Sequence, residues 1–164
     1  MSKVLLVDAG NSRVKWLVAD TTGGYVREPG DSGFVETGAV QTTEEIGRWA
    51  DSLKQLTQEK AIDQVVLSNV LGAGWQGNLA QCLSPLRVVC PKKNQSDQLF
   101  TLYSPVGQLG LDRWFSCLAA SHMTDVELNL VVSFGTATTV DAVVQSSLLP
   151  DHHKVPYVHL GGVI

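Results

Sequence analysis

The 164-residue sequence lacks the features that mark membrane, secreted and nucleic-acid-binding proteins. No segment approaches the roughly 20 consecutive apolar residues of a membrane-spanning helix, and the apolar run at the N-terminus is too short for a signal peptide. Sixteen acidic residues against twelve Lys and Arg give a net charge of −4, which argues against nucleic-acid or anionic-membrane binding. We therefore expect a cytoplasmic protein with neither membrane nor nucleic acid among its partners.

Cysteine is also scarce, and its pattern is not that of a structural site. The three cysteines are odd in number and no two have CxxC spacing, so we expect reduced, buried thiols. The phosphate-binding sequence GxxxxGK[ST] is absent, which excludes a P-loop as the nucleotide site. Any phosphate binding must therefore come from another kind of turn.

The residues that are present indicate a folded α/β protein, with 44% hydrophobic and 17% charged side chains. Hydrophobic periodicity predicts strands at 3–8, 13–20, near 34–37, at 65–71, 86–90, 128–135 and 138–144, and from Tyr157 onward. It predicts helices at 42–60, capped by Thr43, at 78–83 and at 111–123, with a loop over 91–105. The order β-β-β-α-β-α-β, then a helix and a new β-β-β, predicts a mixed sheet that opens with an antiparallel hairpin.

The strand pattern begins again after residue 127, which predicts two domains of similar design. Residues 1–127 would form the first domain, and residues 128–164 the opening strands of a duplicated second domain. The sequence stops just after a glycine pair in an apolar run, whereas natural termini are usually polar. We therefore expect a fragment in which the second domain is incomplete.

Two turns rich in glycine and hydroxyl groups connect strands at the start of these two units. The first contains Asp8, Gly10, Asn11 and Ser12, followed by Lys15, and the second contains Gly135 and Thr136. Backbone N–H groups at such turns bind anions, glycine lets phosphate oxygens approach, and lysine adds a positive charge. The carboxylate of Asp8 could hold the water ligands of Mg²⁺. One such turn would be an ordinary hairpin loop, but two at equivalent places predict a clamp for nucleotide phosphates.

An acid–arginine pair stands at the start of the predicted helix at 111–123. Asp112 and Arg113 follow a Leu-Gly-Leu sequence, and Tyr103 lies upstream in the loop. One interpretation makes Asp112 a helix cap and Arg113 a surface residue. We favour the alternative in which Asp112 accepts or orients a substrate hydroxyl proton and Arg113 binds a carboxylate or the transferred phosphoryl group.

Two further patterns are weaker evidence, one for dinucleotide binding and one for a metal site. The segment LGAGWQG (71–77) matches the GxGxxG fingerprint of dinucleotide-binding proteins, but it follows the fourth predicted strand and no acidic residue ends the next one. We interpret it as a flexible loop between strand and helix. His152, His153 and His159 could form a metal site, but the adjacent pair would point to opposite faces of an extended chain. A solvated loop is the favoured interpretation.

The motifs DAGNSRVK, LGLDRW, FGTATT and LGG, in this order, resemble those of type III pantothenate kinases. The resemblance implies the actin-like ATPase (ribonuclease H-like) fold of the actin–hexokinase superfamily. It also implies ATP-dependent phosphorylation of pantothenate to 4′-phosphopantothenate, the first step of coenzyme A biosynthesis, with ATP and Mg²⁺ bound by a homodimer. Beside this family the chain looks truncated, because the family continues past the glycine pair through most of a second domain.

The resemblance also implies a role for each site residue. The first phosphate-binding motif matches Asp8, Gly10, Asn11, Ser12 and Lys15, the second ATP-contacting motif matches Gly135 and Thr136, and the pantothenate-binding positions match Tyr103, Gly110, Leu111, Asp112 and Arg113, with Asp112 as the catalytic base. Where the family often has an aspartate that helps to hold a monovalent cation, this chain has Ser133, which puts a requirement for K⁺ or NH₄⁺ in doubt. A non-catalytic ATP-binding accessory or regulatory factor and, less favoured, an NAD-binding module stay open as alternatives.

Overall fold

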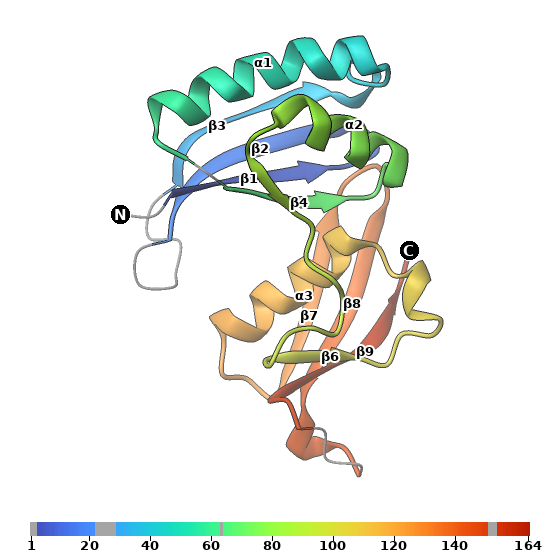
Figure 1. Ribbon diagram of the computed structural model, residues 1–164. Helices are drawn as coiled ribbons and strands as arrows, with labels where there is room; N and C mark the ends of the chain where they lie inside the picture. The colour runs from blue at the N-terminus through green and yellow to red at the C-terminus, as the bar shows by residue number, and fades with distance from the viewer. Residues whose placement is uncertain (1–2, 22–28, 63, 151–153) are drawn as a thin grey trace. The chain divides into compact units, whose positions relative to one another are not determined.

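The computed structural model describes residues 3–21, 29–62, 64–150 and 154–164, with helices and strands labelled in Figure 1. The chain divides into two compact units, unit 1 over residues 1–91 and unit 2 over residues 92–164. Each unit contains one β-sheet. Among the described residues, no helix is long and apolar enough to cross a membrane.

Unit 1 is a five-stranded mixed sheet with two helices on one of its faces (Figure 1). The strand order is β3 (Pro29–Glu36), β2 (Arg13–Asp20), β1 (Lys3–Ala9), β4 (Gln64–Asn69) and β5 (Arg87–Val89). Strands β1, β2 and β3 pair antiparallel, whereas β1, β4 and β5 pair parallel. The helices are α1 (Thr43–Glu59) and α2 (Ala73–Leu83), and a short 3₁₀ helix spans Thr37–Ala39. This is the predicted mixed sheet that opens with a hairpin.

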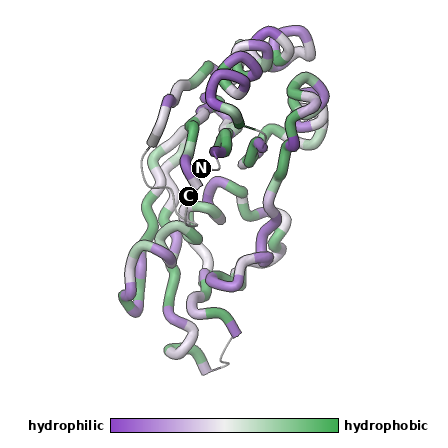
Figure 2. Tube along the Cα trace, turned by 60° about the vertical axis from the view of Figure 1, so that its left-hand side comes forward, coloured by the Kyte–Doolittle hydropathy of each residue, from purple (hydrophilic) through white to green (hydrophobic). Residues whose placement is uncertain are grey.

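The core of unit 1 follows from the two periodicities of its elements. Alternate residues of β1, namely Leu5, Val7 and Ala9, pack toward the helices, and α1 and α2 each contribute a buried apolar stripe to the same cluster. Figure 2 shows the alternation between polar and apolar residues along the helices. Because Asp8 is out of phase with Leu5, Val7 and Ala9, its side chain lies on the sheet face opposite the helices.

Unit 2 is a four-stranded sheet in the order β6-β9-β8-β7, with one α-helix. The elements are β6 (Leu99–Thr101), α3 (Leu111–Met123), β7 (Leu128–Phe134), β8 (Thr138–Gln145) and β9 (Tyr157–Val163), with 3₁₀ helices at Val106–Gln108 and Ser146–Leu148. Strands β7, β8 and β9 are consecutive and antiparallel, and β6 pairs parallel with β9. The β7-β8-β9 series repeats the antiparallel series β1-β2-β3, as the sequence predicts.

The two faces of the second sheet differ in what covers them. On one face, Val131, Val143 and Tyr157 pack with Trp114 and Cys117 of α3. On the other face, the alternate residues of β7 are exposed, with Leu130 at 66% and Phe134 at 84% of full accessibility. Helix α3 therefore determines which face of this sheet is the core of unit 2.

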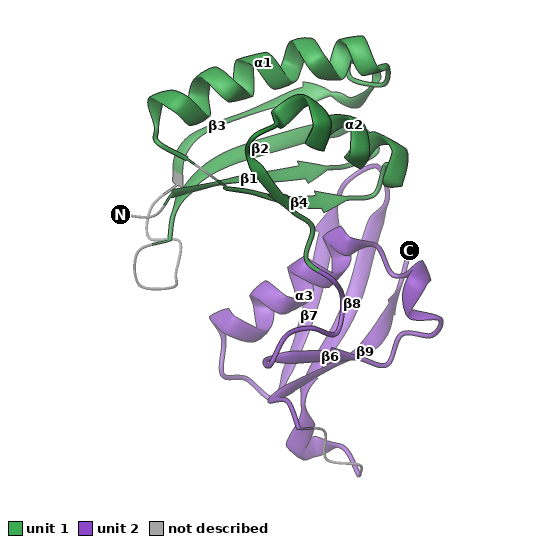
Figure 3. Ribbon diagram, viewed as in Figure 1, with its two compact units in different colours: residues 1–91 green, residues 92–164 purple. Residues whose placement is uncertain are grey.

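The unit boundary differs from the domain boundary that we expected after residue 127. Figure 3 shows that the chain divides after Pro91, so α3 belongs to the unit that contains the second sheet. The reason is packing: α3 buries Trp114 and Cys117 in a cluster with Leu99 of β6 and Val143 of β8. The sequence order of elements alone could not show which sheet this helix covers.

Three local predictions need correction. Strand β6 lies within the segment 91–105 that we expected to be a loop. Helix α2 begins at Ala73 instead of residue 78, so two glycines of the GxGxxG pattern lie inside a helix and the loop interpretation is wrong. The N-cap of α1 is Thr42, whose hydroxyl accepts the Glu45 N–H while the Glu45 carboxylate accepts the Thr42 N–H.

The capping box predicts a position-specific effect on stability. We expect Thr42→Ala to lower the free energy of unfolding by about 1 kcal/mol, because an orphan N–H loses its acceptor, and urea denaturation followed by circular dichroism measures the effect. Thr43→Ala is the matched control, since the cap hydroxyl belongs to Thr42. Equal midpoints for the two variants would contradict the assigned cap.

Candidate functional site

The first predicted phosphate turn lies between β1 and β2 of unit 1. The Gly10 N–H donates to the Arg13 carbonyl at 3.0 Å, which closes the turn. Asp8 and Lys15 lie directly opposite each other in register, with the Lys15 Nζ 3.4 Å from the Asp8 Oδ2. Asn11 and Ser12 are exposed. All five residues of the predicted first motif therefore meet at one accessible turn.

The chain after β3 holds this turn in place. The Thr37 hydroxyl donates to the Gly10 carbonyl at 2.7 Å, and the Thr37 N–H donates to the Ser12 carbonyl at 2.9 Å. A Cβ atom at position 10 would lie 3.1 Å from the Arg13 carbonyl, which is a tight contact. Two turn carbonyls thus have fixed donors, and glycine at position 10 suits the close approach of the backbone.

A residue that the sequence analysis missed completes the row of polar groups beside Asp8. Ser68 of β4 is the register partner of Asp8 on the side away from Lys15. Its Oγ is buried and has no hydrogen-bond partner among the described residues. The side chains of Asp8 and Ser68 therefore present oxygen atoms on one sheet face, and oxygen is the ligand type that Mg²⁺ takes.

The second predicted phosphate turn lies between β7 and β8 of unit 2. The Gly135 N–H donates to the Ala137 carbonyl at 3.1 Å, and both Gly135 and Thr136 are exposed. Just before the turn, Ser133 faces Thr139 across the β7–β8 ladder. The Thr139 Oγ1 is buried without a hydrogen-bond partner in the described structure. The turn thus lies beside a hydroxyl that is buried and has no hydrogen-bond partner among the described residues.

The start of α3 exposes the carboxylate that we expected to be catalytic. Gly110 occupies the N-cap position and the helix begins at Leu111, so the interpretation of Asp112 as a cap is wrong. A Cβ atom at position 110 would overlap the Asp112 Oδ1. Glycine therefore lets the Asp112 side chain fold back over the helix N-terminus, where the helix dipole favours a negative charge. Asp112 is exposed and can be reached by a ligand.

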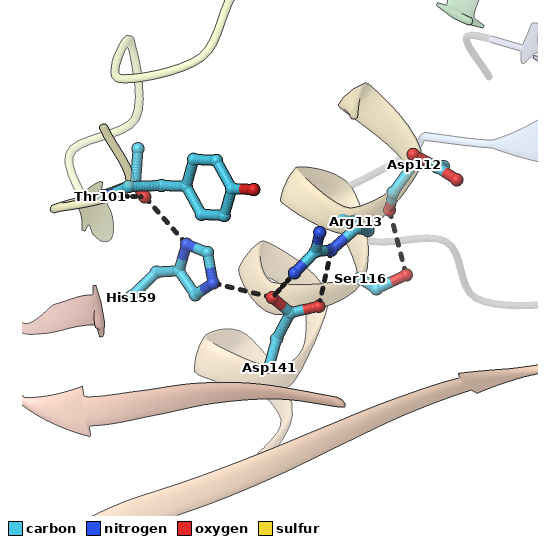
Figure 4. A network of polar contacts seen from close by, with 7 residues as sticks. Thr101, Asp112, Arg113, Ser116, Asp141 and His159 are labelled. Carbon is cyan, nitrogen blue, oxygen red and sulfur yellow. Dashed lines mark hydrogen bonds and ion pairs between the residues drawn. The ribbon is translucent and has the colours of Figure 1, made fainter. Parts of the chain in front are cut away.

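Arg113 is buried, so its interpretation as a surface residue is also wrong. Its Nε donates to the Asp141 Oδ2 at 3.0 Å and its Nη2 donates to the Asp141 Oδ1 at 2.6 Å. The pair is bidentate, and the Asp141 side chain is only 1% exposed (Figure 4). Because both charges are removed from water, the loss of either partner would leave the other buried and unpaired, which is strongly destabilising.

The ion pair continues into a chain of hydrogen bonds (Figure 4). The His159 Nε2 lies 2.9 Å from the Asp141 Oδ1, and the His159 Nδ1 lies 2.7 Å from the Thr101 Oγ1. Burial by itself would raise the pKa of Asp141. The hydrogen bonds from Arg113 and His159 and the Arg113 charge outweigh burial, so the pKa of Asp141 lies below its ordinary value.

Tyr103 lies against both Arg113 and His159 of this network. Its ring is parallel to the His159 ring, with 6.3 Å between centroids, and the Arg113 Cζ is 5.5 Å from its centroid. The Tyr103 N–H donates to the Thr101 Oγ1 at 3.0 Å. Two predicted substrate-binding residues, Tyr103 and Arg113, are therefore neighbours.

The loop that leads into α3 is held by Lys93. Its Nζ donates to the Val106 carbonyl at 2.8 Å and to the Leu109 carbonyl. The ammonium group therefore satisfies carbonyl oxygens just before Gly110 and fixes the chain that carries Asp112.

One group of potential metal ligands occurs in the same region. Ligand atoms of Cys117, Asp141 and His159 lie within 4.8 Å of one another. Both oxygens of Asp141 already accept from Arg113, a fixed cation. Burial, with the Asp141 charge, raises the pKa of the Cys117 thiol to about 12, so a thiolate ligand is disfavoured. We assign this group to an ion-pair network and not to a metal centre.

Asp141 and Thr101 were not among the predicted site residues, and His159 was considered only as a possible metal ligand. The favoured interpretation of His159 as part of a solvated loop is wrong, because this side chain is 0% exposed; His152 and His153 lie outside the described residues. A signal was present: Asp141 stands in the apolar strand TTVDAVV and His159 in YVHLGG. A polar side chain at a core-facing strand position needs a partner, and each of these residues is the partner of the other.

Comparison with known proteins gives a consistent family match. The family profile described as type III pantothenate kinase matches residues 4–150. The type III pantothenate kinase of Cupriavidus pinatubonensis is 31% identical over 150 residues, which cover 85% of this chain and 54% of that protein. The one from Burkholderia lata is 32% identical over 146 residues, which cover 84% and 49%. The chain spans about half the length of these curated relatives.

A solved structure supports the fold independently. The crystal structure of the type II variant of the Aquifex aeolicus Ppx/GppA phosphatase matches with a TM-score of 0.53, over 87% of this chain and 48% of that one. Its 15% sequence identity makes this a likeness of fold alone. The α/β fold of the actin-like ATPases, expected from the sequence motifs, is confirmed.

The site geometry predicts that the three thiols react differently. All three cysteines are unpaired, but Cys117 is fully buried whereas Cys82 and Cys90 are half-buried. With its pKa raised to about 12, the Cys117 thiol should resist iodoacetamide in the folded protein at about pH 8 and react after unfolding in guanidinium. Peptide mass spectrometry identifies the modified residues, and equal labelling of Cys117 in both states would refute its burial.

Proposed function

The chain belongs to the type III pantothenate kinase family, and from this premise we propose that the protein transfers the γ-phosphoryl group of ATP to the primary hydroxyl of pantothenate. This reaction yields 4′-phosphopantothenate, the first step of coenzyme A biosynthesis. The observation that carries the proposal is the family match over residues 4–150, which includes the exposed Asp112 and its buried neighbour Arg113.

In the proposed reaction, Asp112 is the general base. The hydroxyl oxygen of pantothenate forms a bond to the γ-phosphorus as the bond from that phosphorus to the β,γ-bridging oxygen breaks. ADP leaves with the bridging oxygen, and Asp112 takes the hydroxyl proton. Its exposure at the first turn of α3 leaves the carboxylate accessible to an alcohol, and in a loose phosphoryl-transfer transition state the base chiefly orients that alcohol.

Arg113, Tyr103, Gly110 and Leu111 are the proposed pantothenate-binding residues. The Arg113 guanidinium has five N–H donors, and Asp141 accepts from only two of its nitrogens. The remaining donors suit the carboxylate of pantothenate, which is planar and anionic. The Tyr103 ring beside Arg113 supplies an apolar surface for the rest of the molecule.

We propose the turn at Gly10–Ser12 and the turn at Gly135–Thr136 as phosphate-binding elements for ATP. In the first, Lys15 forms an exposed ion pair with Asp8 at 3.4 Å and can exchange Asp8 for a phosphate oxygen. The Asp8 carboxylate and the neighbouring Ser68 hydroxyl, which has no hydrogen-bond partner among the described residues, offer oxygen atoms of the type that Mg²⁺ binds. When bound, this ion would neutralise phosphate charge.

The remaining expectations from the family are also proposals. They are a homodimer, a cytoplasmic location, and a weak dependence on monovalent cations. The last rests on Ser133, which offers a neutral hydroxyl where the family often has a carboxylate. A neutral oxygen attracts K⁺ less than an anionic oxygen does.

Replacing the proposed base tests the reaction. We expect Asp112→Asn to reduce turnover of pantothenate by about 10²–10⁴-fold, because the amide cannot accept the hydroxyl proton, while ATP affinity stays near that of the unchanged protein. Coupled measurement of ADP release gives the rate, and calorimetry gives ATP affinity. Asp125→Asn, at an exposed position beyond the other end of α3, is the matched control.

The outcomes separate the competing functions. If Asp112→Asn keeps full activity, Asp112 is not the base. If the unchanged protein binds ATP but does not turn over pantothenate, the accessory-factor hypothesis is favoured over the kinase.

Substitution at Ser133 tests the cation expectation. We expect weak dependence of the rate on potassium in the unchanged protein, and a stronger dependence after Ser133→Asp, because a carboxylate adds an anionic ligand. Rates across potassium and sodium series at fixed ionic strength decide the matter, with Ser133→Asn as the uncharged control. A strong potassium requirement in the unchanged protein would contradict the interpretation of Ser133.

A further inference from the structure

We propose that Asp141 is a positioning residue, which sets the orientation of Arg113 and, through His159, the placement of Tyr103. The inference rests on the proposed function, because it concerns the two side chains proposed to bind pantothenate. Asp141 does not touch the reacting atoms in this proposal: its side chain is 1% exposed and it acts through its neighbours.

The bidentate geometry determines which edge of Arg113 remains for a ligand. Asp141 accepts from Nε and from Nη2 on one side of the guanidinium, at 3.0 and 2.6 Å. The Nη1 hydrogens and the second Nη2 hydrogen point away from that side, because the group is planar. They form a second fork, which can hold another planar anion. Without Asp141, the guanidinium would lose the two hydrogen bonds that determine which of its edges faces the substrate.

The other side of the network supports Tyr103. The Thr101 Oγ1 accepts the Tyr103 N–H at 3.0 Å, and its own proton can then go to the His159 Nδ1 at 2.7 Å. This arrangement assigns His159 the tautomer with the proton on Nε2, which donates to the Asp141 Oδ1 at 2.9 Å. The ring held at both nitrogens stacks on Tyr103. One carboxylate therefore fixes both proposed substrate contacts.

The backbone of β9 is adapted to this network. A Cβ atom at position 162 would overlap the Asp141 Oδ1 and the Val140 carbonyl oxygen, and it would lie 2.8 Å from the Arg113 Nη2. Gly162, the second glycine of the LGG motif, therefore lets the strand pass directly over the ion pair. This close contact explains the glycine at position 162 without reference to a bound nucleotide.

The test compares Asp141→Asn with Thr101→Val in the purified protein. Asparagine keeps the size of the side chain but loses the charge and one acceptor, whereas valine removes only the hydroxyl that bonds the His159 ring and the Tyr103 N–H. We expect the KM for pantothenate to rise about 10- to 100-fold in Asp141→Asn and less in Thr101→Val, with the KM for ATP changed less than twofold. A merely structural role would alter both substrates alike and lower the melting temperature in proportion. Asp125→Asn is the control.

A second measurement does not depend on activity and remains decisive if Asp141→Asn folds poorly. In ¹⁵N-labelled protein we expect the Arg113 Nε–H to exchange slowly with water, and His159 to show the Nε2–H tautomer, which Thr101→Val should shift. Assignments come from the Arg113→Lys and His159→Gln variants. Rapid exchange of the Arg113 Nε–H, or the opposite tautomer, would overturn the proposal.

The two failures are distinguishable. Absence of pantothenate turnover in the unchanged protein sinks the proposed function, and the NMR signals then decide the positioning role alone. Normal turnover with an unchanged pantothenate KM in a folded Asp141→Asn sinks the positioning role and leaves the proposed function standing.

Discussion

The bidentate ion pair between Arg113 and Asp141 is the constraint on which unit 2 depends. A buried charge that loses its partner is strongly destabilising, so every element that contributes to the network must be placed to satisfy it. Asp141 accepts three hydrogen bonds, from Arg113 of α3 and His159 of β9. The helix, the central strand β8 and the glycine-containing strand β9 therefore have few alternative arrangements. A well-packed apolar pair could give similar stability without fixing a guanidinium edge.

Unit 1 contains another pair of opposite charges, which differs from the first because it is exposed to water. Asp8 and Lys15 lie in register on neighbouring strands, but their side chains are 40% and 62% exposed and their charged atoms are 3.4 Å apart. Water screens such a pair, and its net contribution to stability is small. Either partner can therefore exchange the other for a ligand at little cost. The difference in burial matches the two proposed roles: the buried pair positions side chains, and the exposed pair binds a ligand.

Much of this could be predicted from the sequence where the signal is local. The strand 13–20 and the helix 111–123 have the expected bounds, since periodicity and a turn residue define each end. The mixed sheet followed from the order of elements. The assignment of α3 to the second sheet did not, because a helix with one apolar stripe packs equally well on either sheet as far as its sequence shows. Strand β6 was missed because it stands in a polar segment, whereas the equally short β5 lies in the apolar run LRVVC.

The site shows the same division between local and non-local information. The residues proposed to contact a ligand stand in turns and at a helix start, where the sequence shows more polar side chains than the local structure needs. Asp141 and His159 lie 18 residues apart, on strands where each looks like an isolated polar residue in an apolar run. Only the β8–β9 register places them together. Yet a lone charge in a buried strand must be paired, so such positions mark where the fold holds its functional residues in place, even before their partners are known.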